Sequence, residues 1–153
     1  MTGPALSRGY SIKEVAALTG LPATTLRYYE QIGVITPISR GASSRHRVYD
    51  EQDLDRLVSV SCLAATGMSV SDMRQYMDNV GVGREAAADQ RALLVEQSRR
   101  LAVEAEAIVL RQRYVELKIT SWDAVEAGDH ELAEQISARA VRLADELRHV
   151  GKV

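Results

Sequence analysis

The stretch from Arg84 to Val125 contains neither proline nor glycine, while glycines stand just outside it at positions 83 and 128. Such a composition favours one uninterrupted helix, and roughly forty residues of helix make a rod about 60 Å long. A single small domain cannot cover a rod of that length, so the helix is expected to pair with a partner. An apolar side chain recurs at every seventh position of the stretch. This row consists of Ala87, Leu94, Leu101, Ile108, Val115 and Trp122.

The companion row, four positions further on, is mixed in character. It consists of Arg91, Ser98, Ala105, Gln112 and Ile119. One complete apolar row with a partial second indicates an antiparallel pair of helices rather than a regular parallel zipper. We therefore expect a homodimer held by an antiparallel coiled coil, with packing of the helix within its own chain as the alternative. Its interface is predicted to contain Leu94, Leu101, Ile108, Val115 and Trp122.

Glycine-containing breaks divide the chain into three predicted parts. Val80-Gly81-Val82-Gly83 is the clearest boundary, and Gly128-Asp129 ends the long helix, with Asp129 as the next N-cap. We predict a domain over residues 1–80, a dimerisation helix over 84–125, and a short effector or packing helix within 126–153. The apolar face of this last helix is expected to contain Leu132, Ile136, Ala140, Leu143, Leu147 and Val150. The predicted fold class is mainly α.

The first fifty residues carry signals for two short helices and a hairpin. Ser11 and Glu14 form the pattern of a capping box, and Thr19-Gly20 ends that helix. Pro22 suits the first turn of a second helix that stops near Gly33. The two short helices and the turn between them predict a helix-turn-helix. The polar, glycine-containing segment 39–47 lies between β-branched and aromatic residues, which predicts a small β-hairpin as a basic wing.

Two further helices are predicted before the glycine-rich boundary. Asp50 is the expected N-cap of a helix running from Glu51 to Thr66. Ser69 and Asp72 give another capping pattern for a helix from Val70 to about residue 79.

The net charge of −2, from 19 basic and 21 acidic residues, hides a separation of charge along the chain. Residues 1–47 hold six bases and two acids, a net charge of +4. Residues 48–80 hold two bases and six acids, a net charge of −4. The first fifty residues also hold four of the six tyrosines. This combination fits a surface that contacts nucleic-acid phosphates, whereas the alternative is a solvated surface with uneven charge.

The cysteine count limits the possible chemistry. One cysteine, Cys62, excludes a disulfide framework within the chain, multi-cysteine zinc patterns and iron–sulfur ligation by four thiolates. No metal site and no cofactor are expected. No apolar run has the length of a membrane span or the pattern of a signal peptide, so we expect a cytoplasmic protein with no membrane partner.

Several motifs occur together in the order found in one family of regulators. Residues 10–35 read YSIKEVAALTGLPATTLRYYEQIGVI, and an Arg-x-Arg-x-Tyr pattern follows from Arg45 to Tyr49. Asp53-Leu54 and Gly67-Met68-Ser69 continue the series. Over residues 10–80 this sequence resembles the MerR family of transcriptional regulators. The resemblance implies a winged helix-turn-helix domain, a long dimerisation helix and a C-terminal effector region.

The family resemblance also implies a mechanism. Such regulators bind a near-palindromic operator within an over-long promoter spacer, and they activate by bending and untwisting that DNA for RNA polymerase. This is indirect readout used as a switch. The predicted partners are therefore double-stranded promoter DNA, RNA polymerase and a second copy of the chain. The residues expected to contact DNA are Thr24, Thr25, Arg27, Tyr28, Arg40, Arg45 and Arg47. Tyr29 points about 100° away from Tyr28 on a helix and is expected in the core.

The signal that such a regulator senses is less constrained. Ser61 to Ser69 contains a Cys-Leu-x-x-Thr-Gly-Met pattern similar to the aldehyde- and thiol-stress branch, the AdhR/NmlR-like regulators, which implies Cys62 as a sensor of electrophiles. The alternative is a cysteine that simply packs in the core. A third hypothesis is a pocket for an apolar or cationic small molecule. Its predicted lining is Met68, Met73, Tyr76, Met77, Tyr114 and Trp122.

Two other function classes were considered. An architectural DNA-bending protein without an effector would explain the helix-turn-helix, although the long pairing helix argues against it. An enzyme has no support, because the sequence contains no glycine-rich phosphate loop, no nucleophile with an adjacent base, and no metal constellation.

Overall fold

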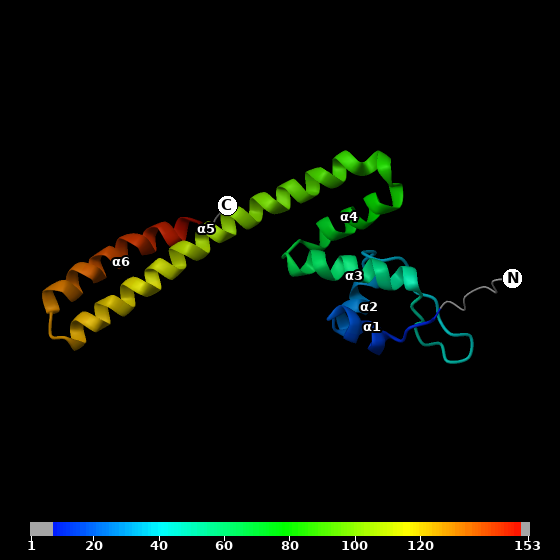
Figure 1. Ribbon diagram of the computed structural model, residues 1–153, viewed down its shortest axis with the longest axis horizontal. Coiled ribbons are helices and arrows are strands. Elements are labelled where there is room, and N and C mark those ends of the chain that lie inside the picture. Colours follow the sequence, from blue (N-terminus) through cyan, green and yellow to red (C-terminus); the bar gives the residue numbers. More distant parts are fainter. Residues whose placement is uncertain (1–7, 151–153) are drawn as a thin grey trace. The chain divides into compact units, whose positions relative to one another are not determined.

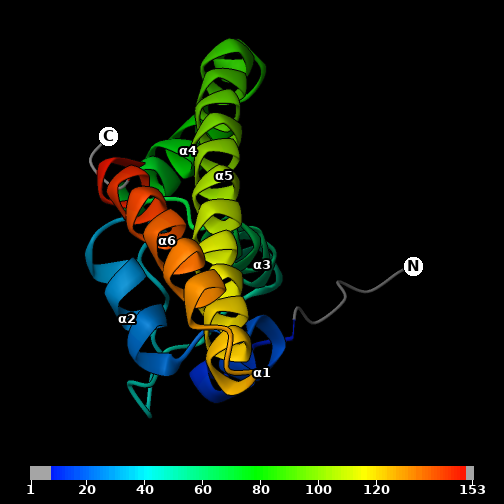
Figure 2. The ribbon, with the colours of Figure 1, turned by 90° about the vertical axis from the view of Figure 1, so that its left-hand side faces the viewer.

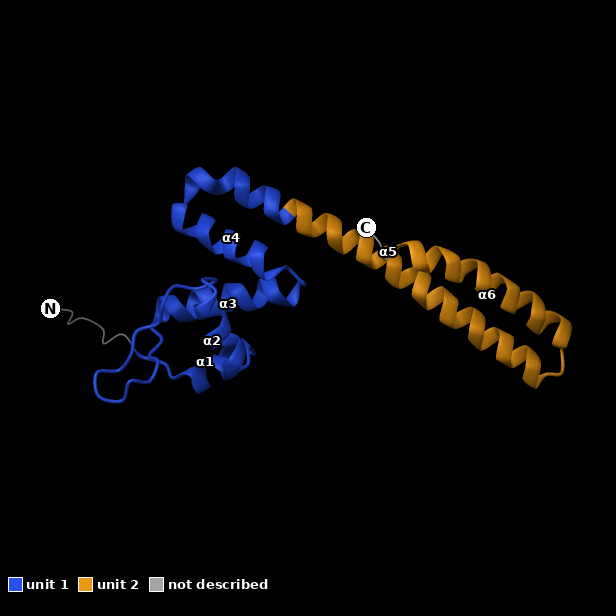
Figure 3. Cartoon of the chain, turned by 180° about the vertical axis from the view of Figure 1, so that it is seen from behind, with its two compact units in different colours: residues 1–94 blue, residues 95–153 orange. Residues whose placement is uncertain are grey.

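A computed structural model describes residues 8–150, which form helices joined by turns and by one longer connection over residues 32–50 (Figure 1). The chain divides into two compact units, with unit 1 ending at Leu94 and unit 2 beginning at Val95 (Figure 3). The division falls inside one long helix, α5, whose first turns belong to unit 1 and whose remainder belongs to unit 2. The mainly helical fold class predicted from the sequence is confirmed.

Unit 1 begins with two short helices in the arrangement that the capping signals predict. Helix α1 spans Ile12–Thr19, and the reciprocal bonds between Ser11 and Glu14 form a complete capping box. Gly20 ends α1 in the left-handed conformation with φ 73°, which glycine adopts without steric cost. Helix α2 spans Ala23–Gln31 after Pro22. The helix-turn-helix is therefore encoded by local signals at each helix end.

The predicted hairpin is reduced to isolated bridges. Arg40 pairs with Arg47, and Tyr10 pairs with Tyr49, each in antiparallel fashion, and no longer strand forms within residues 8–150. The turn between them is closed by bonds from the Gly41 N–H to His46 and from the Arg45 N–H to Gly41. The predicted small hairpin is thus present only as a turn closed by one bridged pair, Arg40 and Arg47.

Helices α3 and α4 complete the first unit before α5. Helix α3 spans Glu51–Ala65 with a capping box between Asp50 and Asp53, and α4 spans Val70–Val82 after Ser69. Helix α4 continues through Gly81, which corrects the expected end near residue 79. Gly83, with φ 89°, ends it, and the short 3-10 helix η1 follows at Arg84–Ala86. The helix therefore ends at Gly83, the last residue of the predicted boundary over residues 80–83.

The core of unit 1 gathers side chains from α1 to α4 and from the wing. Tyr29 is buried, as its helical direction predicts. The largest fully buried side chains are Tyr49, Leu26, Leu57, Met73, Val15, Val34 and Val60.

Unit 2 is a helical hairpin. Helix α5 spans Ala87–Glu126 as one uninterrupted helix of 40 residues, and α6 spans His130–Val150. Gly128, with φ 78°, makes the turn, and the Asp129 carboxylate accepts a bond from the Leu132 N–H, which confirms Asp129 as the N-cap. Helix α6 then runs back along the later part of α5 (Figures 1 and 2).

Small residues form much of the contact between α5 and α6. The Ser121 hydroxyl donates to the backbone carbonyl of Ala133 at 3.3 Å, so the two helices approach closely there. The buried face of α6 begins at Ala133, whereas Leu132 is 42% exposed. Of the predicted apolar face of α6, Ile136, Ala140 and Leu143 are buried in the single chain. The side chains buried in the hairpin include Ala107, Ser121, Ala124, Ala133, Ile136, Ala140 and Leu143. Within residues 8–150, no helix is both long and apolar enough to cross a membrane.

Candidate nucleic-acid interface

A basic hollow of about 220 Å³ lies in unit 1, where the start of α1 meets α2 and the wing. The N-terminus of α1 carries partial positive charge from its backbone N–H groups. Three arginines, one lysine and one histidine contribute to the same wall, and no acidic side chain lines it. The lining residues are Ser11, Ile12, Lys13, Arg27, Arg40, His46 and Arg47. Such a hollow has the chemistry of a phosphate-binding surface.

The exposed face of α2 presents three of the predicted DNA-contacting residues. Thr24, Arg27 and Tyr28 are exposed, and Thr25 is half-buried. The Tyr28 ring lies beside the buried Tyr29 ring, with 6.2 Å between the ring centroids. Because Tyr29 is anchored in the core, Tyr28 is held outward next to Arg27. Helix α2 thus offers hydroxyl and guanidinium donors on one side.

Arg47 has a partner that sequence reasoning did not assign. Its Nε donates to the Glu30 carboxylate at 2.8 Å, across 17 residues of chain. Both side chains are largely buried, so the pair is shielded more than a surface ion pair. The pair ties the wing to the end of α2. Arg47 also lines the basic hollow.

The wing loop holds the other two predicted arginines. The Arg40 guanidinium donates to the backbone carbonyl of Arg45 at 3.1 Å, which braces the loop from inside. Arg45 has φ 55°, a left-handed conformation that is uncommon for a residue with a side chain. Arg45 does not line the hollow, whereas Arg40 and Arg47 do. The geometry therefore brings Arg27, Arg40 and Arg47 together and leaves Arg45 on the outer loop.

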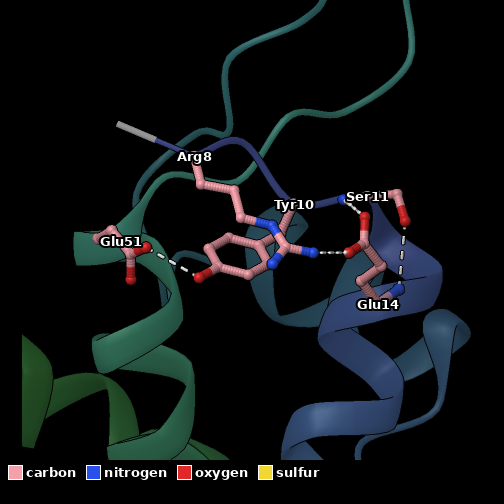
Figure 4. Close-up of polar contacts among 5 residues, drawn as sticks. All are labelled: Arg8, Tyr10, Ser11, Glu14 and Glu51. Carbon is pink, nitrogen blue, oxygen red and sulfur yellow. Dashed lines mark hydrogen bonds and ion pairs between the residues drawn. The ribbon is translucent and has the colours of Figure 1, made fainter. Parts of the chain in front are cut away.

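The chain before α1 forms a polar clamp that sequence reasoning missed (Figure 4). The Tyr10 hydroxyl donates to Glu51 at 2.8 Å, and the Arg8 guanidinium lies 5.2 Å from the centre of the Tyr10 ring. Arg8 also pairs with Glu14 at 3.0 Å. The clamp joins the start of α1 to the start of α3, and the spacing of 41 residues between Tyr10 and Glu51 gave no local signal for it.

These contacts change the acidity of two groups in the clamp. The hydrogen bond to Glu51 raises the pKa of Tyr10, because it stabilises the protonated hydroxyl. The bond from the Ser11 backbone lowers the pKa of Glu14, with Arg8 adding to the effect. Glu14 is therefore held as a carboxylate, the form that the capping box requires.

Tyr49 is the one buried side-chain polar group without a hydrogen-bond partner among the described residues. Its ring is fully buried beneath the wing, and burial raises the pKa of its hydroxyl. Arg47 and Glu30 act on that hydroxyl in opposite directions, since the cation lowers its pKa and the carboxylate raises it. The wing therefore sits on a tyrosine that contributes packing rather than a hydrogen bond.

The remaining predicted site residues fall in separate places. Cys62 is exposed on α3, so packing in the core does not account for it. Met68 and Met73 belong to the core of unit 1 with Met77 at its edge, whereas Tyr114 and Trp122 belong to unit 2. Neither unit by itself contains all the residues of the predicted pocket for an apolar or cationic small molecule. Across residues 8–150, no group of three or more histidine, cysteine or acidic side chains is arranged to hold a metal ion.

The predicted pairing row is accessible in the single chain. Helix α6 covers a different side of α5, where Ala107, Ser121 and Ala124 are buried. The five large side chains of the row remain exposed. They are Leu94, Leu101, Ile108, Val115 and Trp122, with the Trp122 side chain reaching 68% exposure.

These features define the class of protein as a helix-turn-helix domain with a basic wing, followed by a long helix. Residues 10–80 match the family model described as MerR HTH family regulatory protein. Over this region, which is less than half of the chain, the sequence is similar to the MerR family of helix-turn-helix regulators.

Curated relatives agree with this assignment. The HTH-type transcriptional regulator AdhR of Bacillus subtilis is 33% identical over 91 residues, which cover 60% of this chain and 64% of AdhR. The HTH-type transcriptional regulator SkgA of Caulobacter vibrioides is 34% identical over 97 residues, which cover 63% of this chain and 35% of SkgA. The matched part is thus less than two thirds of each relative. These relatives are transcriptional regulators, not enzymes.

Solved structures share the fold over most of the chain. A putative MerR family transcriptional regulator from Listeria monocytogenes has a TM-score of 0.66 and 26% identity, covering 85% of this chain and 98% of that one. HiNmlR, a MerR family regulator lacking the sensor domain and bound to promoter DNA, has a TM-score of 0.67 and 22% identity. It covers 82% of this chain and 96% of its own.

Proposed function

We propose that this protein is a MerR-type transcriptional regulator that binds promoter DNA through the helix-turn-helix and wing of unit 1. The observation that carries the proposal is the basic hollow, in which Arg27, Arg40 and Arg47 converge beside the N-terminus of α1. A DNA phosphate is the ligand whose charge this wall complements. HiNmlR, which has a similar fold, is bound to promoter DNA in its crystal structure.

The residues of α2 and those of the wing have different roles in DNA binding. Thr24, Thr25 and Arg27 lie on the second helix of the helix-turn-helix, the element that enters the major groove in this class of motif. Tyr28 supplies a hydroxyl for a flanking phosphate. Arg40, Arg45 and Arg47 hold the backbone beside the groove from the wing. Phosphate contacts of this kind position the domain, and base contacts from α2 specify the site.

We further propose that the protein acts as a homodimer on an inverted repeat. The exposed row on α5 supports antiparallel pairing, because α6 leaves all five of its large apolar side chains uncovered. Two helix-turn-helix domains then hold two half-sites at a fixed separation. Bending and untwisting of the DNA between them activates transcription by RNA polymerase at a promoter whose spacer is too long.

The test of DNA binding begins with duplexes selected by the wild-type protein from a randomised pool. Affinity is measured by gel shift over a range of salt concentrations for wild type, Arg27→Ala and a control variant, Arg139→Ala. Arg139 is an exposed residue of α6. Arg27→Ala is expected to weaken binding and to reduce the salt slope by about 0.9, the value for one lost phosphate contact. Arg139→Ala is expected to match wild type. Equal slopes for all three proteins would refute the assigned surface.

For the signal, we propose a reaction of the exposed Cys62 thiol with an electrophile such as an aldehyde or quinone. The thiolate sulfur adds to the electrophilic carbon, and the oxygen of the adduct takes a proton from water, so no oxidant is required. The added bulk on α3 alters the geometry of the dimer on its DNA. Accessibility of the thiol favours this hypothesis over a purely structural cysteine.

The thiol hypothesis is tested by transcription in vitro with formaldehyde, methylglyoxal or a quinone. Wild type is expected to respond and Cys62→Ser is not. A response that is the same in both proteins would favour the non-covalent effector instead. DNA bending without any effect on transcription would favour the architectural class.

A further inference from the structure

The corner between α4 and α5 is held by a chain of three side-chain amides. The Gln75 amide donates to the Asn79 carbonyl oxygen at 2.9 Å, and the Asn79 amide donates to the Gln90 carbonyl oxygen at 3.1 Å. The Gln90 amide then donates to the backbone carbonyl of Tyr76 at 3.0 Å. Gln90 lies in the first turns of α5, so two of the three bonds cross from α4 to α5, and all of these residues belong to unit 1.

Asn79 is the buried centre of this chain. Its residue is 6% exposed, and both ends of its side-chain amide are used. A buried amide stabilises a structure only in the one geometry that satisfies its bonds, because breaking them leaves an unpaired polar group. This behaviour differs from that of an apolar contact, which tolerates sliding and rotation. Buried asparagines in paired helices fix register in the same way.

At this corner the small side chain of Ala86, in η1, is buried, while the larger apolar side chains at the end of α4 are exposed. Val80 and Val82, at the end of α4, are more than half exposed. A hollow of about 420 Å³ lies beside the amide chain and is lined by Gln75, Asn79, Asp89, Ala92 and Leu93. The backbone turns at Gly83, whose φ of 89° is accessible mainly to glycine. The hydrogen bonds of the amide chain are therefore the contacts at this corner that depend most strongly on direction.

We propose that Asn79 and Gln90 are positioning residues that set the half-site spacing accepted by the dimer; this inference rests on the proposed function. In a dimer paired through α5, the angle at which α5 leaves α4 is one of the angles that fix the separation of the two helix-turn-helix domains. The amide chain holds that angle. Without it, the corner relaxes and the dimer accepts neighbouring spacings.

The experiment uses duplexes carrying two copies of the half-site selected by the wild-type protein, moved apart or together one base pair at a time. Binding of the full-length protein is measured for wild type, Asn79→Leu and Gln90→Leu. Asn79→Leu keeps the number of side-chain heavy atoms and their branching but removes the hydrogen bonds. Gln75→Ala is the matched control, since it removes an amide of the same chain but leaves both bonds between α4 and α5. A duplex with a single half-site measures the domain alone.

Wild type and Gln75→Ala are expected to prefer one spacing. The two test variants are expected to bind the single half-site as wild type does but to lose about tenfold of that preference, the scale of one poorly matched contact. Circular dichroism and thermal unfolding establish that each variant is folded, and Gln90→Glu, at a half-buried position, provides a milder disruption. An unchanged spacing preference in a folded Asn79→Leu or Gln90→Leu would overturn the inference. If wild type bound no selected duplex at all, the proposed function itself would fail.

Discussion

Arg47 and Glu30 are joined by a bond of 2.8 Å, with only 19% and 15% of their side chains exposed. The pair connects the wing to the end of α2, two segments that local sequence signals treat as separate. It also gives Arg47 two functions, because the same guanidinium that anchors the wing lines the basic hollow. Removal of either partner therefore has consequences for stability and for DNA binding that differ in kind.

We expect Glu30→Gln to destabilise the folded protein by about 1–3 kcal/mol, because it leaves a partly buried cation without its charged partner. The same change is expected to tighten binding to non-specific DNA, since the Arg47 charge is no longer neutralised. Chemical denaturation and gel shifts with random duplexes measure the two effects. A variant that lost both stability and DNA affinity would contradict the proposed division of roles.

The capping box of α1 is expected to make stability depend on pH. The pKa of Glu14 is lowered below its ordinary value of 4.5, so its contribution is present above that value and is lost as the pH falls through the folded-state pKa. Thermal unfolding is compared between wild type and Glu14→Gln across acidic pH. The wild-type protein is expected to be more stable near neutrality, and the difference is expected to shrink in acid. A difference that did not vary with pH would exclude this explanation.

Tyr49→Phe is expected to leave stability unchanged or to raise it by up to about 1 kcal/mol. The substitution removes a buried hydroxyl that has no hydrogen-bond partner and keeps the buried ring. Tyr28→Phe, at an exposed position, serves as the comparison and is expected to have no effect on stability. A loss of more than about 1 kcal/mol on Tyr49→Phe would mean that the hydroxyl makes a bond in solution.

Ile108→Glu is expected to dissociate the dimer, because it places a charge in the middle of the pairing row. Val109→Glu is the matched control. Both side chains are exposed on the single chain, at 51% and 62%, so neither substitution disturbs the core of unit 2. Residue 109 points about 100° away from residue 108 on the helix. Analytical ultracentrifugation is expected to find monomers for Ile108→Glu and dimers for Val109→Glu, and equal masses would argue against the row as the interface.

The sequence predicted best those features whose signals are local. The capping box at Ser11, the N-caps at Asp50 and Asp129 and the burial of Tyr29 each depend on residues within one or two helical turns. The end of α4 was misplaced, because Gly81 is helical when the following residues continue the helix. Whether a glycine lies in a helix or ends it depends on the bonds available to the next few residues.

Local sequence patterns could not predict contacts between segments that are distant along the chain. Nothing near Arg47 indicates Glu30, and nothing near Tyr10 indicates Glu51, because each pair forms only after the chain has folded. Which apolar side chains of α6 are buried also depends on a contact between distant segments. A close approach of α5 and α6 at Ser121 selects the small side chain of Ala133 for the buried position and turns the larger leucine outward.

The continuity of α5 places a limit on how the length of this protein can change. Each residue inserted into a helix turns everything beyond it by about 100° and shifts it by about 1.5 Å. One extra residue between Leu94 and Leu101 would therefore turn the later part of the row out of line with its earlier part. Insertions or deletions of seven residues would nearly preserve the phase. Changes in the length of α5 by whole heptads therefore keep the apolar row in line, whereas other changes in length do not.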